Sequence, residues 1–179
     1  SSAIPENNSE VVFAKQSGTP VLSRAQIMSA ITTKKRSIVV SGTHGKTTTS
    51  SILSVILAAS GAQPSFLIGG DLNEIGCGAL WNAASELFVV EGDESDGSFL
   101  ELESDISIIT SIESDHLSFY KSDKSLKAAF QAFAAGTKEM VYLFGDTPAT
   151  EYLRNLSNVR MYGEGDKNDY KLKKYSGTR

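Results

Sequence analysis

The segment from Gly42 to Thr47 reads Gly-Thr-His-Gly-Lys-Thr, and these are the residue types of a phosphate-binding loop. Glycines let successive backbone N–H groups converge on phosphate oxygens, and the start of a following helix adds partial positive charge. Lys46 can reach the outer phosphates of a nucleotide, and the hydroxyl of Thr47 can ligate Mg²⁺. The full eight-residue pattern is not met, because Val40 stands where its first glycine would be. A glycine-containing turn with an exposed lysine is the alternative, but the apolar run before the loop and the helical pattern after it favour phosphate binding.

Acidic residues and a histidine follow two further apolar runs. The first of these segments, Glu91–Asp96, reads Glu-Gly-Asp-Glu-Ser-Asp, and in the second Asp115 directly precedes His116. The sequence has only two histidines, His44 and His116. In an open α/β sheet, ligands bind beyond the carboxyl ends of the strands, so these groups are predicted to share an edge with the phosphate loop. There a carboxylate can reach a metal held by phosphate, and a neutral imidazole is a competent metal ligand. A solvated acidic turn and a structural histidine are the alternatives.

The elements that position these residues alternate between strand and helix patterns from residue 37 onward. Strands are expected at 19–22, 38–40, 66–68, 87–90, 106–112, 141–144 and 159–162, with an edge strand at 170–175. Helices are expected at 9–16, 24–31, 47–60, 123–136 and 148–156. Asn8 or Ser9 is the expected N-cap of the first, Ser23 and Gln26 form a capping box at the start of the second, and Gly61 ends the third. The helix at 47–60 is apolar on most faces and is expected to be buried. Residues 32–36 are expected to be a linker and 71–85 a loop with a short helix, in which Cys77 and Trp81 pack. This order predicts the α/β class, with a mostly parallel sheet and right-handed crossovers.

Length and composition describe an ordinary globular chain. The 179 residues predict one or at most two domains, and 40% hydrophobic and 21% charged residues exclude a disordered chain. Seventeen Lys and Arg against 21 Asp and Glu give a net charge of −4, which argues against general nucleic-acid binding. The single cysteine indicates a reducing compartment, and no apolar run is long enough to cross a membrane. The N-terminus has no signal-peptide pattern, so we expect a soluble cytoplasmic protein without membrane or nucleic-acid partners, of undetermined oligomeric state.

Three ordered motifs resemble those of the Mur ligase family, the ATP-dependent amide-forming ligases of peptidoglycan synthesis. They are residues 42–49, 91–99 and 112–116. Within the family, His44 and the Asp-Glu-Ser-Asp run resemble the corresponding segments of the branch that joins L-alanine to UDP-N-acetylmuramate. Residues 1–4 and 19–25 resemble segments of the same branch. The resemblance implies a central ATP-binding domain at 37–179, truncated and with a P-loop NTPase-like three-layer architecture. It also implies that residues 1–36 are the remnant of a Rossmann-like UDP-sugar-binding domain and a linker.

The same resemblance implies a two-step reaction that uses ATP and Mg²⁺. ATP phosphorylates the lactyl carboxylate of UDP-N-acetylmuramate, and the amine of L-alanine then displaces phosphate from the acyl phosphate. Carried over to this sequence, Lys46 and His116 are catalytic, Thr47 and Glu91 hold one Mg²⁺, and His116 holds a second. The implied nucleotide-binding residues are Gly42, Thr43, His44, Gly45, Lys46, Thr47 and Thr48, with the role of His44 left open. Positive charge from the lysine and the metal ions is needed because a carboxylate that attacks the triphosphate must have the negative charge neutralised at both the attacking and the leaving oxygens.

Parts of the family pattern have no counterpart in this sequence. The region around 130–131 has no lysine that could be carbamylated, as in the alanine-adding branch, and the adenine-recognising segment and the C-terminal domain are missing. We therefore expect no ligation by these residues alone. A tripeptide-adding ligase of cell-wall recycling and a non-catalytic P-loop nucleotide-binding module are the alternatives, whereas a kinase or GTPase needs no metal-binding histidine at a strand end. The geometric prediction is that Lys46, Thr47, Glu91 and His116 converge at one sheet edge, with Lys46 facing solvent.

Overall fold

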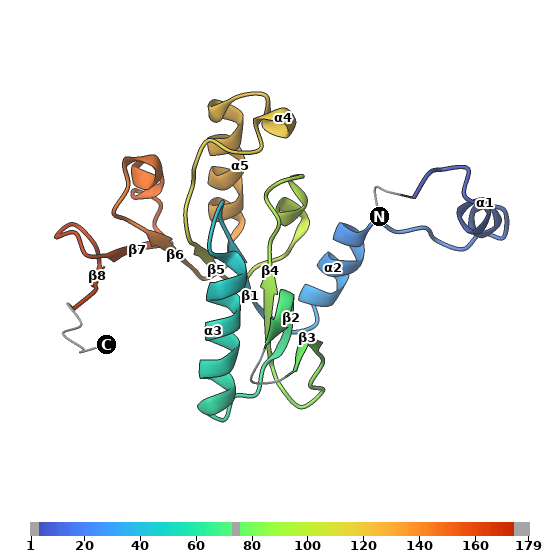
Figure 1. Ribbon diagram of the computed structural model, residues 1–179, viewed down its shortest axis with the longest axis horizontal. Helices are drawn as coiled ribbons and strands as arrows, with labels where there is room; N and C mark the ends of the chain where they lie inside the picture. The colour runs from blue at the N-terminus through green and yellow to red at the C-terminus, as the bar shows by residue number, and fades with distance from the viewer. Residues whose placement is uncertain (1–3, 73–75, 174–179) are drawn as a thin grey trace.

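The computed structural model describes residues 4–72 and 76–173, and an eight-stranded sheet forms the centre of this part of the chain (Figure 1). The strand order is β3-β2-β4-β1-β5-β6-β7-β8. β2 and β3 pair antiparallel and every other neighbouring pair is parallel, so the α/β class with a mostly parallel sheet is confirmed. The strands are β1 (Arg36–Ser41), β2 (Ser65–Leu72), β3 (Cys77–Leu80), β4 (Leu87–Glu91), β5 (Ile106–Ile109), β6 (Met140–Phe144), β7 (Val159–Gly163) and β8 (Tyr170–Lys171).

Polar side chains cap three of the helices, and for α1 and α2 these are the caps that the sequence predicted. Asn8 caps α1, Ser23 and Gln26 form the capping box of α2, and Ser122 caps α5. The helices are α1 (Ser9–Gln16), α2 (Arg24–Thr32), α3 (Lys46–Ala59), α4 (Leu117–Tyr120) and α5 (Asp123–Gly136), with 3₁₀ helices η1 (Ser98–Glu101) and η2 (Pro148–Leu153). No residue of α1 is buried, and Figure 1 shows this helix standing apart from the sheet. Within the described ranges, no helix has the length and apolar character needed to cross a bilayer.

The alternating side chains of the central strands enter two separate cores. Ile38 and Val89 face one side of the sheet, where they pack with partly buried apolar residues of α3. Val39 and Val90 face the other side, where the core includes Phe130 and other residues of α5. Helices therefore cover both faces of the sheet, which confirms the three layers expected from the sequence.

β1 lies between β4 and β5 and sets the edge at which the predicted site residues gather. Val40 is in register with Glu91 at the end of β4, and Ser41 is in register with Ile109 at the end of β5. Because the three strands are parallel, the loops that follow them leave the sheet at the same edge. The phosphate loop, the acidic run and the segment that carries His116 are these three loops.

β2 continues past its predicted end and returns as β3, so the expectation of a loop with a short helix at 71–85 is wrong. Glycines hide the strand pattern here: a Cβ on Gly78 would lie 2.7 Å from the carbonyl oxygen of Gly70. The two strands approach too closely for any side chain at that position. Cys77 is half-buried and packs against the core beside α3, as expected. Trp81 is 52% exposed, but its ring also packs, edge-on to Phe88 with ring centroids 6.1 Å apart. Within this segment, residues 73–75 lie outside the described part.

Three other elements are shorter than the sequence indicated, and a fourth is absent. Residues 19–22 are exposed and pair with no described strand, so the expected strand is absent. The helix expected at 148–156 is the shorter 3₁₀ helix η2, because the Asn and Ser residues that follow it favour a turn. β5 ends before 110–112, and Thr110 and Ser111 bond to the phosphate loop instead. Of the edge strand, 170–171 pair as β8, and 174–175 lie outside the described residues.

The helix α3 covers one face of the sheet but is not buried all round. Its buried residues are Ser50 and Ser54, whereas Ile52 and Ile56 are 55% and 58% exposed. The expectation that most of its faces are buried is therefore wrong. The sheet supplies a contact surface on one side of the helix, and no other described element covers the two isoleucines on the outer side.

Candidate functional site

The phosphate loop connects the buried strand β1 to the start of α3. Gly42 and Gly45 have φ angles of +133° and +84°, in the left-handed range that glycine tolerates. A Cβ on Gly42 would approach the side chain of Thr110 and lie 2.8 Å from the backbone nitrogen of Ser111. Glycine therefore lets the loop pass close against the segment that follows β5.

This segment after β5 holds the loop in shape. Thr110 donates its hydroxyl to the carbonyl oxygen of His44 at 2.5 Å, and Ser111 Oγ accepts the His44 N–H at 2.9 Å. Thr43 donates its N–H to the Ser111 carbonyl at 3.1 Å. On its other side, Thr43 Oγ1 accepts the N–H of Glu113 at 2.9 Å. The shape of the loop is thus fixed by bonds to the continuation of a neighbouring strand.

The N-terminus of α3 is built to receive an anion. Gly45 is its N-cap residue and has no side chain to cap the helix. The N–H of Thr49, which bonds to the Gly45 carbonyl at 2.9 Å, is the first donor with an acceptor inside the helix. The preceding N–H groups, up to that of the exposed Thr48, therefore lack intrahelical acceptors. Such groups together with the helix dipole favour a phosphate at this position.

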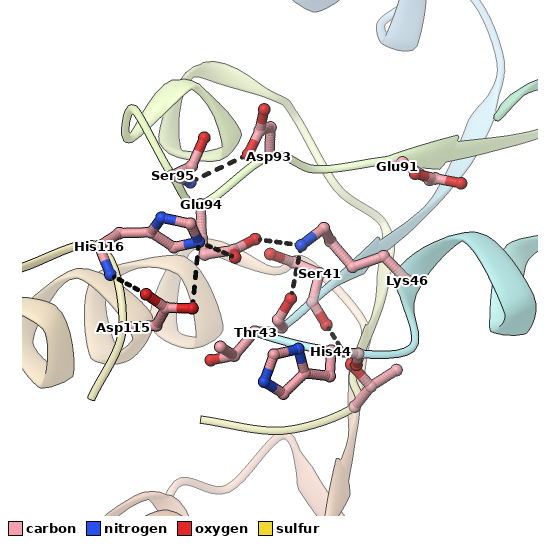
Figure 2. A network of polar contacts seen from close by, with 12 residues as sticks. Ser41, Thr43, His44, Lys46, Glu91, Asp93, Glu94, Ser95, Asp115 and His116 are labelled. Atoms are coloured by element: carbon pink, nitrogen blue, oxygen red, sulfur yellow. Dashed lines mark hydrogen bonds and ion pairs between the residues drawn. The ribbon is translucent and has the colours of Figure 1, made fainter. Parts of the chain in front are cut away.

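Lys46 is held inside the site rather than facing solvent. Its side chain is 20% exposed, and Nζ donates to the carbonyl oxygen of Gly42 at 2.8 Å. Nζ also lies 2.8 Å from Oε2 of Glu94, whose side chain is 1% exposed (Figure 2). The expectation of a solvent-facing lysine is therefore wrong, because a buried carboxylate of the acidic run attracts the ammonium group inward.

Glu91, at the end of β4, is directed towards the start of α3. Its carboxylate accepts hydrogen bonds from Thr47 Oγ1 at 3.2 Å and from the N–H of Gly69 at 3.0 Å, and the buried Ser50 hydroxyl lies 2.9 Å from it. Hydroxyl and carboxylate oxygens side by side are hard ligands of the kind that Mg²⁺ takes together with the phosphates of a substrate. Thr47 and Glu91 therefore fit the metal that the sequence predicted for them.

His116 enters the site from the loop after β5 with a left-handed backbone, at φ +55°. Its N–H donates to Asp115 Oδ1 at 2.7 Å, and its Nε2 lies 3.4 Å from Oε1 of Glu94. Across residues 4–72 and 76–173, no group of three or more His, Cys, Asp or Glu side chains gathers closely enough to hold a metal by itself. The role of His116 as a ligand of a second Mg²⁺ stays a prediction.

Three of the four residues predicted to converge, Lys46, Glu91 and His116, line one cavity of about 410 Å³ at the carboxyl edge of the sheet. The fourth, Thr47, is not in its wall, but its hydroxyl donates to Glu91 at 3.2 Å. The charged and histidine residues in its wall are Arg24, Lys46, Glu91, Asp93, Glu94 and His116. The structure thus brings Lys46, Glu91 and His116 together as the sequence predicted, although it does not test their chemical roles. His44 is exposed and is not part of this wall; its Nε2 lies 3.7 Å from the carboxylate of Glu113.

The main chain that carries Glu94 is anchored by Tyr120, which donates its hydroxyl to the Glu94 carbonyl oxygen. Burial, together with the negative charge of Glu94, raises the pKa of Tyr120 to about 12, so the hydroxyl remains a donor at neutral pH. Hydrogen bonds from the Ser98 side chain and N–H lower the pKa of Asp96. The acidic run thus contains an exposed carboxylate that stays ionised and a buried one at the cavity wall.

Sequence reasoning missed the side chains that support the predicted site residues. It named the acidic run but gave no reason to separate Glu94 from Asp93. Ser50 lies one helical turn after Lys46, and this spacing is a signal that could have placed its hydroxyl on the site face of α3. Ser111 was included in an expected strand, so its bonds to the phosphate loop could not be foreseen.

Comparison with known proteins gives a consistent result. The family model described as the Mur ligase middle domain matches residues 40–179. A UDP-N-acetylmuramate–L-alanine ligase of Syntrophomonas wolfei is 39% identical over 179 residues, which cover 95% of this chain and 38% of the relative. The ligase of the same name from Salinispora arenicola is 48% identical over 134 residues, 75% of this chain and 26% of the relative. The chain therefore spans between about a quarter and two fifths of the length of these relatives.

Two solved structures resemble the fold. A UDP-N-acetylmuramate–alanine ligase of Thermotoga maritima superposes with a TM-score of 0.79 at 27% identity, over 96% of this chain and 39% of that chain. A UDP-N-acetylmuramate:L-alanyl-γ-D-glutamyl-meso-diaminopimelate ligase of Neisseria meningitides gives a TM-score of 0.77 at 24% identity, over 89% of this chain and 56% of that chain. Because the identity to the Neisseria meningitides ligase is only 24%, this similarity supports the fold alone.

Proposed function

The chain belongs to the Mur ligase family, and on that premise we propose that it is the ATP-binding part of a ligase that joins L-alanine to UDP-N-acetylmuramate. Two curated relatives at 39% and 48% identity support this choice of substrates, because both are named for that activity. The chain covers at most 38% of these two relatives, so the complete reaction is proposed for a longer enzyme that contains it.

One observation of the structure carries the proposal. Lys46 of the phosphate loop, Glu91 from β4 and His116 from the loop after β5 line the same cavity. A phosphate loop alone is common to many nucleotide-binding proteins. Activation of a carboxylate by ATP also requires oxygen ligands for a metal and polar groups around the acceptor, and the two additional strand ends supply such groups.

In this proposal, Lys46 and the unpaired N–H groups at the start of α3 bind the triphosphate. Gly42, Thr43, His44, Gly45 and Thr48 complete the proposed nucleotide contacts. Thr47 and Glu91 hold Mg²⁺, which when bound neutralises charge on the phosphates. His116 is proposed as the protein ligand of a second Mg²⁺.

The chemical sequence follows from what amide formation requires. A carboxylate does not react with an amine until its oxygen becomes a leaving group. Transfer of the terminal phosphoryl group to the lactyl carboxylate of UDP-N-acetylmuramate gives an acyl phosphate and ADP. The amine of L-alanine attacks the acyl carbon, the amide bond forms, and inorganic phosphate leaves. Lys46 stabilises the negative charge on the phosphates during the transfer.

We also propose a division of the chain into residues 1–36, the end of a UDP-sugar-binding domain with a linker, and 37–179, the central ATP-binding domain. Support comes from the family match, which begins at residue 40, and from the first strand of the sheet, which begins at Arg36. The exposed α1 is consistent with a segment whose packing partners belong to another domain.

Nucleotide binding can be tested on this chain by calorimetry. We expect adenylyl imidodiphosphate with Mg²⁺ to bind the wild type and Lys46→Ala to weaken the binding at least about tenfold, because a charge-assisted hydrogen bond to phosphate is lost. Lys138→Ala is the matched control, since it removes an exposed lysine that pairs with Glu103 at 2.8 Å. Absence of binding by the wild type, or an equal loss in the control, would contradict the proposal.

Ligation can be tested with a chimaera. The Syntrophomonas wolfei relative aligns over 179 residues, so its matching segment can be replaced by this chain. We expect phosphate release that depends on both UDP-N-acetylmuramate and L-alanine, and none when Lys46→Ala is introduced into the chimaera. A chimaera that uses a tripeptide in place of L-alanine would favour the recycling ligase. Alanine-dependent turnover by the 179 residues alone would contradict the proposed division of the enzyme.

A further inference from the structure

Glu94 is a buried carboxylate for which the proposed reaction has no role so far. Its side chain is 1% exposed and forms part of the wall of the 410 Å³ cavity. No described donor makes a well-aligned hydrogen bond to either carboxylate oxygen. A buried charge in this condition requires a nearby cation to offset the loss of hydration.

Two side chains from different loops approach this carboxylate. Lys46 Nζ lies 2.8 Å from Oε2, and His116 Nε2 lies 3.4 Å from Oε1. Figure 2 shows Glu94 between them. The main chain of Glu94 is fixed, because its carbonyl oxygen accepts hydrogen bonds from the Tyr120 hydroxyl and, at 3.1 Å, from the Gly97 N–H. The carboxylate is therefore held where it contacts both groups.

A separation of 2.8 Å is the distance at which a lysine would bind a phosphate oxygen. In the nucleotide-free chain, Glu94 thus takes the contact that the proposed function assigns to the triphosphate. We propose that Glu94 is a positioning residue that holds Lys46 in the empty site and must release it to the phosphates. This inference rests on the proposed function, because it presumes that Lys46 binds phosphate.

The charge of Glu94 then opposes polyanion binding, and its removal is expected to strengthen binding. With inorganic tripolyphosphate as the probe and no divalent cation present, Glu94→Gln should bind at least about tenfold more tightly than the wild type, because a like charge beside the anion is removed. A substitution that merely damaged the site would weaken binding. Glu94→Asp retains the charge and should not show the gain. Glu103→Gln, at an exposed carboxylate 2.8 Å from Lys138, is the matched control and should behave as the wild type.

Calorimetry with Mg²⁺ and adenylyl imidodiphosphate, run beside the tripolyphosphate titrations, separates the two hypotheses. If the wild type binds the analogue but Glu94→Gln gains no affinity for tripolyphosphate, this inference is overturned and the proposed function stands. If the wild type binds neither probe, the proposed function itself is overturned.

A structure of the wild type with the analogue gives a test that needs no variant. The inference expects Lys46 Nζ to lie more than 4 Å from both carboxylate oxygens of Glu94 when the phosphates are bound. A lysine that keeps its separation of 2.8 Å from Glu94 while the phosphates occupy the loop would overturn the inference.

Discussion

Replacement of Lys46 by alanine is expected to destabilise the fold, because it leaves the buried Glu94 carboxylate without its nearest cation. At 2.8 Å and an effective dielectric constant of about 20, the attraction between the two charges is roughly 6 kcal/mol before the cost of dehydrating both groups. Removal of one partner from a buried pair typically costs about 3–5 kcal/mol. Lys46 is 20% exposed and His116 Nε2 stays 3.4 Å from the carboxylate, so we expect a loss of about 2–3 kcal/mol in the free energy of unfolding.

A double-mutant cycle measured by urea unfolding isolates this pair. In the Glu94→Gln background, where no charge is left behind, Lys46→Ala should cost less than about 1 kcal/mol, which gives a coupling energy of about 2 kcal/mol. Lys127 and Asp123 are the matched control, because they also lie 2.8 Å apart but their side chains are 40% and 44% exposed. Their coupling is expected to be about 0.3–0.5 kcal/mol. A Lys46–Glu94 coupling no larger than that of the control would refute the reasoning that burial makes this pair strong.

Three further substitutions test the loop, its support and a distant turn. Gly42→Ala is expected to lower the free energy of unfolding in urea by at least about 2 kcal/mol and to abolish nucleotide binding. Gly61 is the control, because it also has a positive φ but no atom lies within 4 Å of an added Cβ, so Gly61→Ala should cost only about 1 kcal/mol. Equal losses would contradict the steric argument. Ser50→Ala removes a hydroxyl that lies 2.9 Å from the Glu91 carboxylate, so calorimetry should show Mg²⁺-dependent nucleotide binding weakened about three- to tenfold. Ser54→Ala is the control and should leave the affinity unchanged, because the buried Ser54 hydroxyl has no described partner. Equal affinities of the two variants would contradict the role of Ser50 in supporting Glu91. Hydrogen bonds from two backbone N–H groups of the loop after β7 lower the pKa of Asp146. Its stabilising effect is therefore complete above about pH 4 and is lost as the pH falls further. Asp146→Asn should flatten the decline of the urea midpoint between about pH 4 and pH 2, and an unchanged decline would argue against this effect.

The phosphate loop and the central strands could be predicted because local chemistry restricts them strongly. A run such as Ile38–Val40 has few alternatives to a buried strand, and a Gly-Lys-Thr sequence at the start of a helix matches a known means of holding phosphate. The capping box of Ser23 and Gln26 is equally local, because donor and acceptor lie within one turn. Parallel strand order then brought Glu91 and His116 to the predicted edge.

The remaining features depend on contacts between segments that are distant in the sequence. Nothing in the composition of the acidic run separates Glu94 from its neighbours; it is buried because Gly97 turns the chain at φ +74° and Tyr120 binds its carbonyl oxygen. β3 was missed because close approach of two strands selects glycine at Gly78, and glycine is read as a loop signal. The outer face of α3 was misjudged because an apolar composition does not show how many layers cover a helix.

A structure of this chain bound to Mg²⁺ and adenylyl imidodiphosphate tests the central claim most directly. The account predicts that the phosphates lie on the N–H groups at the start of α3, with Lys46 Nζ on the outer phosphates. It predicts the metal between Thr47 Oγ1, the Glu91 carboxylate and phosphate oxygens, and His116 in the same cavity. A triphosphate bound elsewhere on the sheet, or a metal that contacts neither Thr47 nor Glu91, would contradict the assignment of this edge as the ATP site.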